Sequence, residues 1–206
     1  MRDLPNRPFI VLGIPYRVEV VDRPDPYDVD CVRYIERARA VVRVRADVSD
    51  TYMKRLIFGV ISRDAAQLLD PGRGFDYQME SAFSAAYYGM FKKNPKVLAF
   101  CAGWTDEIPR SVEVGGVSWP IKLVDFCPGG DKDTFGLALY LEQTIYLLSD
   151  LNLPLMRQVL IHELGHAVAE VSAPGIMEDE AYLRAFQISM YYALRDNEKW
   201  IRYLFA

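Results

Sequence analysis

Residues 153–175 read LPLMRQVLIHELGHAVAEVSAPG, a mostly apolar stretch that predicts a buried helix. Pro154 suits the first helical turn, where no backbone N–H donor is needed, and Pro174-Gly175 ends the run. Both histidines of the chain, His162 and His166, lie in this stretch. Because residues four apart share one face of a helix, the two imidazoles can close on a single metal ion.

The five residues His162-Glu163-Leu164-Gly165-His166 match the His-Glu-x-x-His pattern of zinc peptidases. In such a site Glu163 lies beside the metal, where its carboxylate takes a proton from metal-bound water. The alternative is a core helix that happens to carry three polar residues. Burying two unpartnered histidines and a glutamate would be costly, so the pattern favours a metal site with Glu163 as the catalytic base.

A catalytic zinc site needs a third protein ligand and an open position for water. No histidine remains, and the nearest acids are Glu178-Asp179-Glu180, at the start of a second helix predicted over 181–195. Glu180 is the first choice for the ligand and Glu178 the second. Asp179 is expected to point away or to accept a hydrogen bond from one imidazole. Acids also suit a helix N-terminus without any metal, which is the simpler interpretation for two of the three.

The chain also repeats itself: laying residues 1–103 over 104–206 without a gap gives 19 identical pairs. Random pairing would give about a third of that. The matches fall at positions with structural demands, which predicts a duplicated domain. They include Gly13/Gly116, Met53/Met156, Pro71/Pro174, Gly72/Gly175, Phe83/Phe186, Tyr88/Tyr191 and Asn94/Asn197.

The first copy lacks every proposed functional residue. Gly59 stands opposite His162, Val60 opposite Glu163, Arg63 opposite His166 and Tyr77 opposite Glu180. We therefore expect residues 1–103 to form a degenerate, metal-free repeat and residues 104–206 to form the metal-binding domain. The first half would stabilise the second or contribute to a substrate groove.

Each half shows predicted strands followed by predicted helices, which indicates the α+β class. The expectation is two tandem zincin-like repeats, each a small antiparallel or mixed sheet followed by two helices. The predicted strands are 9–12, 16–21, 32–35 and 40–45 in the first half, and 111–114, 119–124, 135–141 and 144–148 in the second. The predicted helices are 50–69 and 78–91, then the motif helix and the ligand helix, with 197–205 as a last helical turn.

Composition and charge limit the possible binding partners and cellular compartments. The net charge of −4 gives no nucleic-acid footprint, and no apolar run reaches membrane-spanning length. Three scattered cysteines, Cys31, Cys101 and Cys127, and the lack of a signal-peptide core after Met1 predict reduced thiols in a cytoplasmic protein. Arginines at 33, 37, 39, 43 and 45 are interpreted as the solvated face of an edge strand, with an acidic-partner surface as the alternative.

The motif half resembles the small zinc metallopeptidases of the ImmA/IrrE type, which are common on phages and mobile elements. The resemblance rests on HELGH and on a following helix with the stripe Glu180-Ala181-Tyr182-Leu183-Arg184-Ala185-Phe186, and it covers roughly residues 117–196. It implies zinc ligands His162, His166 and Glu180 and the base Glu163. The chain departs from that family in its shorter approach to the ligand helix and in its empty first half.

The function expected from these residues is zinc-dependent hydrolysis of a peptide bond in a protein or peptide substrate. Tyr182, Tyr191 and Tyr192 on the ligand helix are candidates for a proton donor, although tyrosines at helical spacing are more often core residues. The competing interpretation is a non-catalytic scaffold or interaction module that contains zinc. Retention of Glu163 argues against it, because a structural site needs no base.

Overall fold

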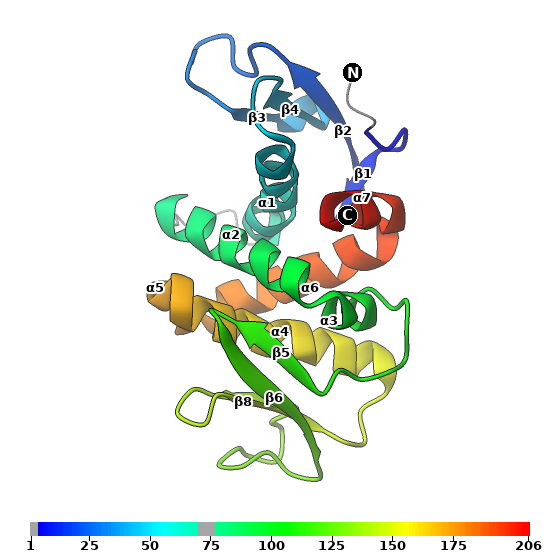
Figure 1. The fold of residues 1–206 in the computed structure, drawn as a ribbon, viewed down its shortest axis with the longest axis vertical. Coiled ribbons are helices and arrows are strands. Elements are labelled where there is room, and N and C mark those ends of the chain that lie inside the picture. The colour runs from blue at the N-terminus through cyan, green and yellow to red at the C-terminus, as the bar shows by residue number, and fades with distance from the viewer. Residues whose placement is uncertain (1–3, 70–76) are drawn as a thin grey trace.

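The computed structural model describes residues 4–69 and 77–206. Strands precede helices in each half, so the α+β class is confirmed (Figure 1). The first half contains β1 (Phe9–Val11), β2 (Ile14–Val21), β3 (Arg33–Glu36), β4 (Val41–Arg45), α1 (Asp50–Leu69), α2 (Tyr77–Lys93) and α3 (Pro95–Cys101). The second half contains β5 (Ser111–Val114), β6 (Val117–Val124), β7 (Gly136–Leu139), β8 (Thr144–Leu148), α4 (Leu153–Ser172), α5 (Pro174–Met177), α6 (Glu180–Asp196) and α7 (Glu198–Phe205).

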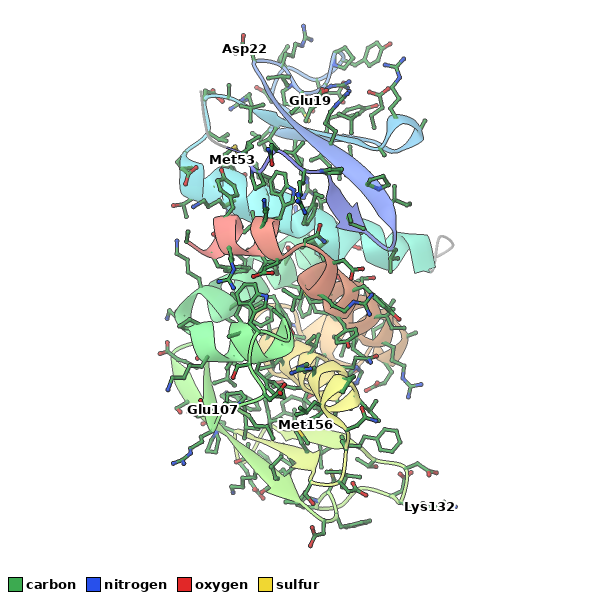
Figure 2. The ribbon with its side chains drawn as sticks, turned by 90° about the vertical axis from the view of Figure 1, so that its right-hand side faces the viewer. Glu19, Asp22, Met53, Glu107, Lys132 and Met156 are labelled. Atoms are coloured by element: carbon green, nitrogen blue, oxygen red, sulfur yellow. The ribbon has the colours of Figure 1, made fainter. Side chains whose placement is uncertain are left out.

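The two sheets have the same topology and the same strand register. Their strand orders are β1-β2-β4-β3 and β5-β6-β8-β7, and in each the central pair is parallel while the two outer pairs are antiparallel. Val18 pairs with Val42 in the first sheet, and Ile121 pairs with Ile145 at the equivalent position in the second. Met53 and Met156 likewise stand near the starts of the equivalent helices α1 and α4 (Figure 2). The structure therefore carries the repeat at the ungapped offset that the sequence predicts.

The sheets lie at opposite ends of the molecule, and the helices fill the space between them (Figure 1). Helix α1 packs under the first sheet and α4 under the second. Helix α2 of the first half packs against α4, and helix α6 of the second half packs against α1. The halves are thus interlocked, with each half contributing one long helix to the packing of the other.

Two equivalent asparagines tie each half to the β-hairpin of the other. The Asn197 side chain accepts a hydrogen bond from the Ile10 backbone N–H and donates one to the Ile10 carbonyl, both at 2.6 Å. Asn94 makes the same pair of bonds to Glu113, at 2.8 and 2.9 Å. Each side-chain amide also donates to a carbonyl of its own helix, Ala193 or Met90. This double use explains why asparagine stands at both positions.

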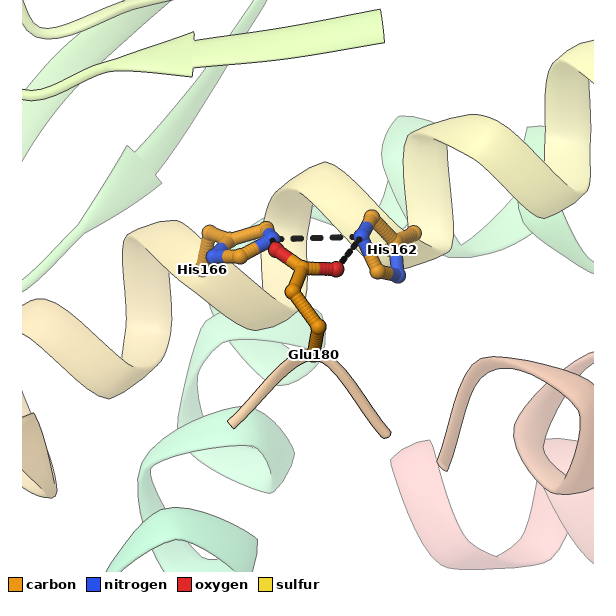
Figure 3. Close-up of side chains that lie close together, drawn as sticks. All are labelled: His162, His166 and Glu180. Atoms are coloured by element: carbon orange, nitrogen blue, oxygen red, sulfur yellow. Dashed lines mark hydrogen bonds and ion pairs between the residues drawn. The ribbon is translucent and has the colours of Figure 1, made fainter. Parts of the chain in front are cut away.

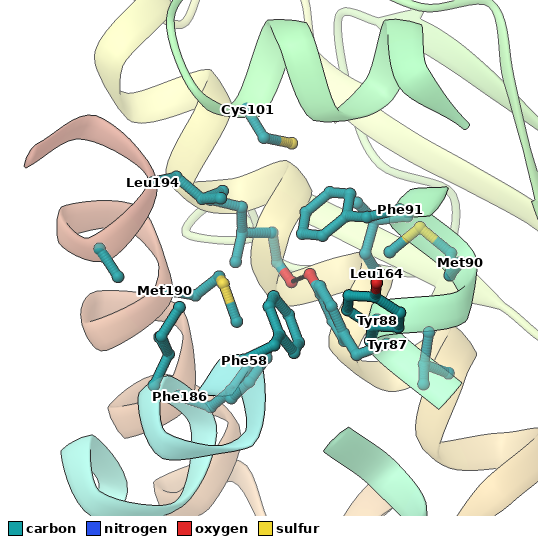
Figure 4. Close-up of a cluster of buried hydrophobic side chains, with 14 of the residues drawn as sticks. Phe58, Tyr87, Tyr88, Met90, Phe91, Cys101, Leu164, Phe186, Met190 and Leu194 are labelled. Carbon is teal, nitrogen blue, oxygen red and sulfur yellow. Dashed lines mark hydrogen bonds between the residues drawn. The ribbon is translucent and has the colours of Figure 1, made fainter. Parts of the chain in front are cut away.

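One continuous hydrophobic core runs through both halves. At its centre, Phe58 and Tyr87 from the first half meet Phe186 and Leu164 from the second (Figure 4). The Tyr87 hydroxyl donates to the Ile161 carbonyl of the motif helix at 2.9 Å, while burial raises the pKa of Tyr87 well above its usual value. The phenol is therefore a neutral donor that anchors α4 from the opposite half.

The interpretation of the arginine-rich strand as an edge strand was wrong. Strand β4 is central rather than an edge, and Arg43 on it bonds Glu19 at 3.2 Å and Glu36 at 2.8 Å, so the arginine-rich strand lies within a cross-strand ion-pair network. Each half has its two long helices as expected, α7 matches the helical turn predicted over 197–205, and the short helices α3 and α5 are additional. Helix α4 ends at Ser172, as the Pro174-Gly175 pair predicts, and Pro174 then begins the short helix α5. The predicted break at Pro71-Gly72 lies outside the described residues.

Among the residues described, no helix combines the length and the apolar character needed to cross a membrane. The three cysteines are free thiols, and Cys101 and Cys127 are buried. Burial raises the pKa of Cys127, and the neighbouring charge of Glu163 raises it further. These two buried thiols behave as small core side chains.

Candidate metal centre

Helix α4 carries the histidine motif and has a well-defined N-terminus. Asn152 precedes the helix, and its side chain accepts a hydrogen bond from the Leu155 backbone N–H at 3.0 Å, with Pro154 in the first turn. Leu160 and Leu164 on the inner face are fully buried. The inner face therefore holds the helix against the core, while His162 and His166 face a groove on the other side.

Helix α6 brings the third candidate ligand, and the structure separates the three acids that the sequence left open. Asp179 caps the helix by accepting a hydrogen bond from the Tyr182 backbone N–H at 3.0 Å. Glu178 is exposed and follows α5. Glu180, in the first turn, is the acid that reaches both imidazoles.

The three side chains converge on one point (Figure 3). The Nε2 atoms of His162 and His166 are 3.1 Å apart. The Glu180 carboxylate lies 3.3 Å from the first and 3.0 Å from the second. Tetrahedral zinc with ligand bonds of about 2.0 to 2.1 Å places neighbouring ligand atoms about 3.3 Å apart. The donor set and its spacing therefore fit a zinc ion, and all three residues that would hold it line the groove.

Both imidazoles are held in the neutral form that can bind a metal. Burial is the largest cause of the lowered pKa of His162, followed by the neighbouring charge of His166. Burial also lowers the pKa of His166, which Glu180 partly opposes. The second ring nitrogens differ. Nδ1 of His166 lies 3.2 Å from the Tyr140 hydroxyl, whereas Nδ1 of His162 is buried without a well-formed hydrogen bond, although the Leu183 backbone is near enough to raise its pKa slightly.

Glu163 lies between the motif helix and strand β7, with 6% of its surface exposed. Burial raises its pKa to about 8, while the backbone of Ala138 favours the carboxylate and opposes the shift. Gly136 on β7 makes room for it, because a Cβ atom there would lie 3.0 Å from the Glu163 carboxylate and would overlap Cγ1 of Val159. The bare backbone at residue 136 is thus a requirement for the position of Glu163.

The site opens into a groove of about 880 Å³. Its walls are strand β7 with the loop before it, the outer stripe of α4 and the outer stripe of α6. A volume of this size accommodates a ligand of several residues. Tyr140, Gly136 and Arg184 lie in its walls, and none of the three was singled out for a role at the site from the sequence. For Tyr140, the only indication in the sequence was its place near the end of a predicted strand.

The candidate proton donors on the ligand helix do not line the groove. Tyr182 is buried and packs on Phe83 and Phe186. Tyr191 is also buried, and the exposed Tyr192 lies outside the groove. On α6, Ala185 is buried, whereas Ala181 and Ile188 are exposed.

Among the described residues, the equivalent place in the first half is much smaller. A cavity of about 70 Å³ remains there, lined by Gly59, Leu56, Glu80 and Arg33. Arg33 occupies the position of Gly136, and its guanidinium donates to the Leu56 carbonyl at 2.8 Å. A Cβ atom on Gly59, the counterpart of His162, would lie 2.9 Å from that guanidinium. The arginine therefore fills the space that an imidazole takes in the second half.

Comparison with known proteins gives no match: no protein-family model, no curated protein and no solved structure corresponds to this chain.

Proposed function

We propose that the protein is a zinc-dependent peptidase whose single active site lies in the second half. The observation that carries the proposal is the convergence of His162, His166 and Glu180 beside the buried Glu163, at the floor of an open groove. A structural zinc site needs neither a fourth position facing a groove nor an adjacent carboxylate that is held out of water.

Each residue has a distinct task in this proposal. His162, His166 and Glu180 hold the zinc ion. When bound, zinc acts as a Lewis acid toward the substrate carbonyl and the attacking water. Glu163 takes a proton from that water and returns it to the leaving amine, a role for which a buried carboxyl of raised proton affinity is suited. Strand β7 keeps bulk water away from Glu163 on its other side.

The test combines zinc content with the variant Glu163→Gln. Protein purified without an affinity tag and exposed to zinc at neutral pH should carry about one zinc per chain, measured by elemental analysis. Glu163→Gln should keep the zinc and the fold but lose hydrolysis, since it removes the base and leaves the ligands in place. Glu170→Gln, on the same helix but outside the groove, is the matched control.

Two results would contradict the proposal. Full cleavage of a substrate by Glu163→Gln would remove Glu163 from the mechanism. One tightly held zinc without hydrolysis of any peptide would favour the non-catalytic scaffold instead.

A further inference from the structure

Arg184 is a charged residue of the groove that the proposed zinc chemistry does not use. It lines the groove, is exposed, and makes no hydrogen bond or ion pair with any residue in the described part of the chain. It follows Glu180 by four residues, so it lies on the same face of α6 and about 6 Å further along the helix axis. By contrast, Arg195 on the same helix bonds its neighbour Asp196 at 2.7 Å.

The position of Arg184 along the groove follows from its neighbours. Its positive charge acts on His162, which places it on the His162 side of the metal centre. Apart from the metal centre, the groove has both polar lining residues, Asp131 and Asp133 among them, and apolar ones. Leu155 lies two turns before His162 on α4, and Ile188 lies one turn after Arg184 on α6. Phe135, which immediately precedes β7, is 47% exposed and Ile188 is 37% exposed, so both present apolar surface to the groove.

A guanidinium group that lacks a partner in a groove suits a carboxylate ligand. The planar fork of arginine matches the two oxygens of a carboxylate, and such charged pairs are among the stronger hydrogen bonds in proteins. An extended peptide advances about 3.3 to 3.6 Å per residue. A carboxylate at Arg184 would therefore lie one or two residues away from a carbonyl held at the metal centre.

We infer that Arg184 is a specificity-determining residue that binds a substrate carboxylate within two residues of the scissile bond, with an apolar substrate side chain against Leu155 and Ile188. The inference rests on the proposed peptidase function. The carboxylate has two possible sources: the C-terminus of the substrate or the side chain of an aspartate or glutamate. Both use the same contact at Arg184, and the experiment separates them.

The first experiment uses the zinc-loaded protein and a randomised octapeptide library, made with either free or amidated C-termini. Cleavage one or two residues from a free C-terminus, absent from the amides, identifies the terminal carboxylate. Internal cleavage near aspartate or glutamate in both libraries identifies the acidic side chain. Arg184→Gln should then lower kcat/KM about 10- to 100-fold, with a smaller loss for Arg184→Lys, because lysine keeps the charge but not the fork. Arg195→Gln is the control and should leave kcat/KM unchanged. Cleavage without a carboxylate preference, or full activity of Arg184→Gln, overturns the inference.

The second experiment separates failure of the inference from failure of the proposed function. Absence of all cleavage by the zinc-loaded protein counts against the peptidase. The carboxylate contact is then measured by binding of N-acetyl-leucine and N-acetyl-leucinamide to the zinc-loaded protein. The acid should bind more tightly, and Arg184→Gln should remove most of that difference. Equal binding of acid and amide, or a preference that survives Arg184→Gln, overturns the inference.

Discussion

The two halves of the chain share strand order, strand register and the order of their long helices, yet one carries a candidate metal centre in an open groove and the other a much smaller cavity. The difference lies in few side chains. His162 and Gly136 in the second half correspond to Gly59 and Arg33 in the first. The scaffold is therefore separable from the site: the sheet and helices form without the ligands, and a single arginine fills the volume that the ligands leave.

The comparison also shows what the first half contributes to the structure of the second. Helix α2 of the first half packs on the motif helix α4, and the Tyr87 hydroxyl bonds its Ile161 carbonyl. The position of His162 thus depends on residues that belong to the other repeat. The first half acts as a structural partner for the second, in the way that one subunit of a dimer supports the other.

The largest expected effect comes from removing one of the ligands that the first half lacks. His166→Ala should reduce zinc content from about one ion per chain to none, because two protein ligands do not form a tetrahedral site. The fold should persist, since the equivalent helix α1 forms without such ligands. Elemental analysis and circular dichroism measure the two expectations, and retention of stoichiometric zinc would show that the metal lies elsewhere.

The next largest effect is expected from placing arginine at residue 136, as at the equivalent residue 33 of the first half. Gly136→Arg should lower hydrolysis at least about 100-fold, because any side chain at 136 displaces Val159 and Glu163 from their present positions. Overpacking should also lower the free energy of unfolding by about 1 to 3 kcal/mol. The converse variant Arg33→Gly should leave hydrolysis and zinc content unchanged. A Gly136→Arg protein with full activity would remove the steric argument.

A smaller effect should follow from removing one set of hydrogen bonds between the halves. Asn197→Ala replaces a buried side chain and removes its two hydrogen bonds to the partly buried Ile10 backbone, so the free energy of unfolding should fall by about 1 to 3 kcal/mol. Asn94→Ala should cost less, since Asn94 is only partly buried and water can replace it at Glu113. Denaturant titration of both variants measures the order, and a greater loss for Asn94→Ala would contradict this account.

The smallest effect concerns the hydrogen bond behind a single ligand. Tyr140→Phe should weaken zinc binding about 10-fold, because it removes the oxygen that fixes the His166 ring through Nδ1. The loss should be visible in chelator competition as well as in hydrolysis. Tyr146→Phe is the control, since that hydroxyl bonds Glu142 on the same hairpin and lies outside the groove. Equal zinc affinity in wild type and Tyr140→Phe would show that the ring is held by packing alone.

Much of the fold could be read from the amino-acid sequence because it depends on local patterns. The strands 111–114 and 144–148 and the helix 50–69 have the predicted bounds, since alternation, turn residues and caps act over a few positions. The ungapped repeat predicted equivalent helices, and His162, His166 and Glu180 do lie together because a short connection joins their two helices. The short helices α3 and α5 were missed, since segments of seven and four residues carry little periodic signal.

The groove residues that come from different helices and strands could not be predicted from local patterns. Tyr140, Gly136 and Arg184 meet at the groove because β7, α4 and α6 pack around it, and no local pattern marks such a meeting. Local patterns also do not show that β4 lies inside its sheet, or that α2 and α6 each pack against a helix of the other half. Periodicity shows that a helix has an apolar face, but which partner covers that face depends on the total area that each arrangement buries. Local chemistry thus set the elements and the metal-binding motif, while long-range packing set the groove and the dependence of one half on the other.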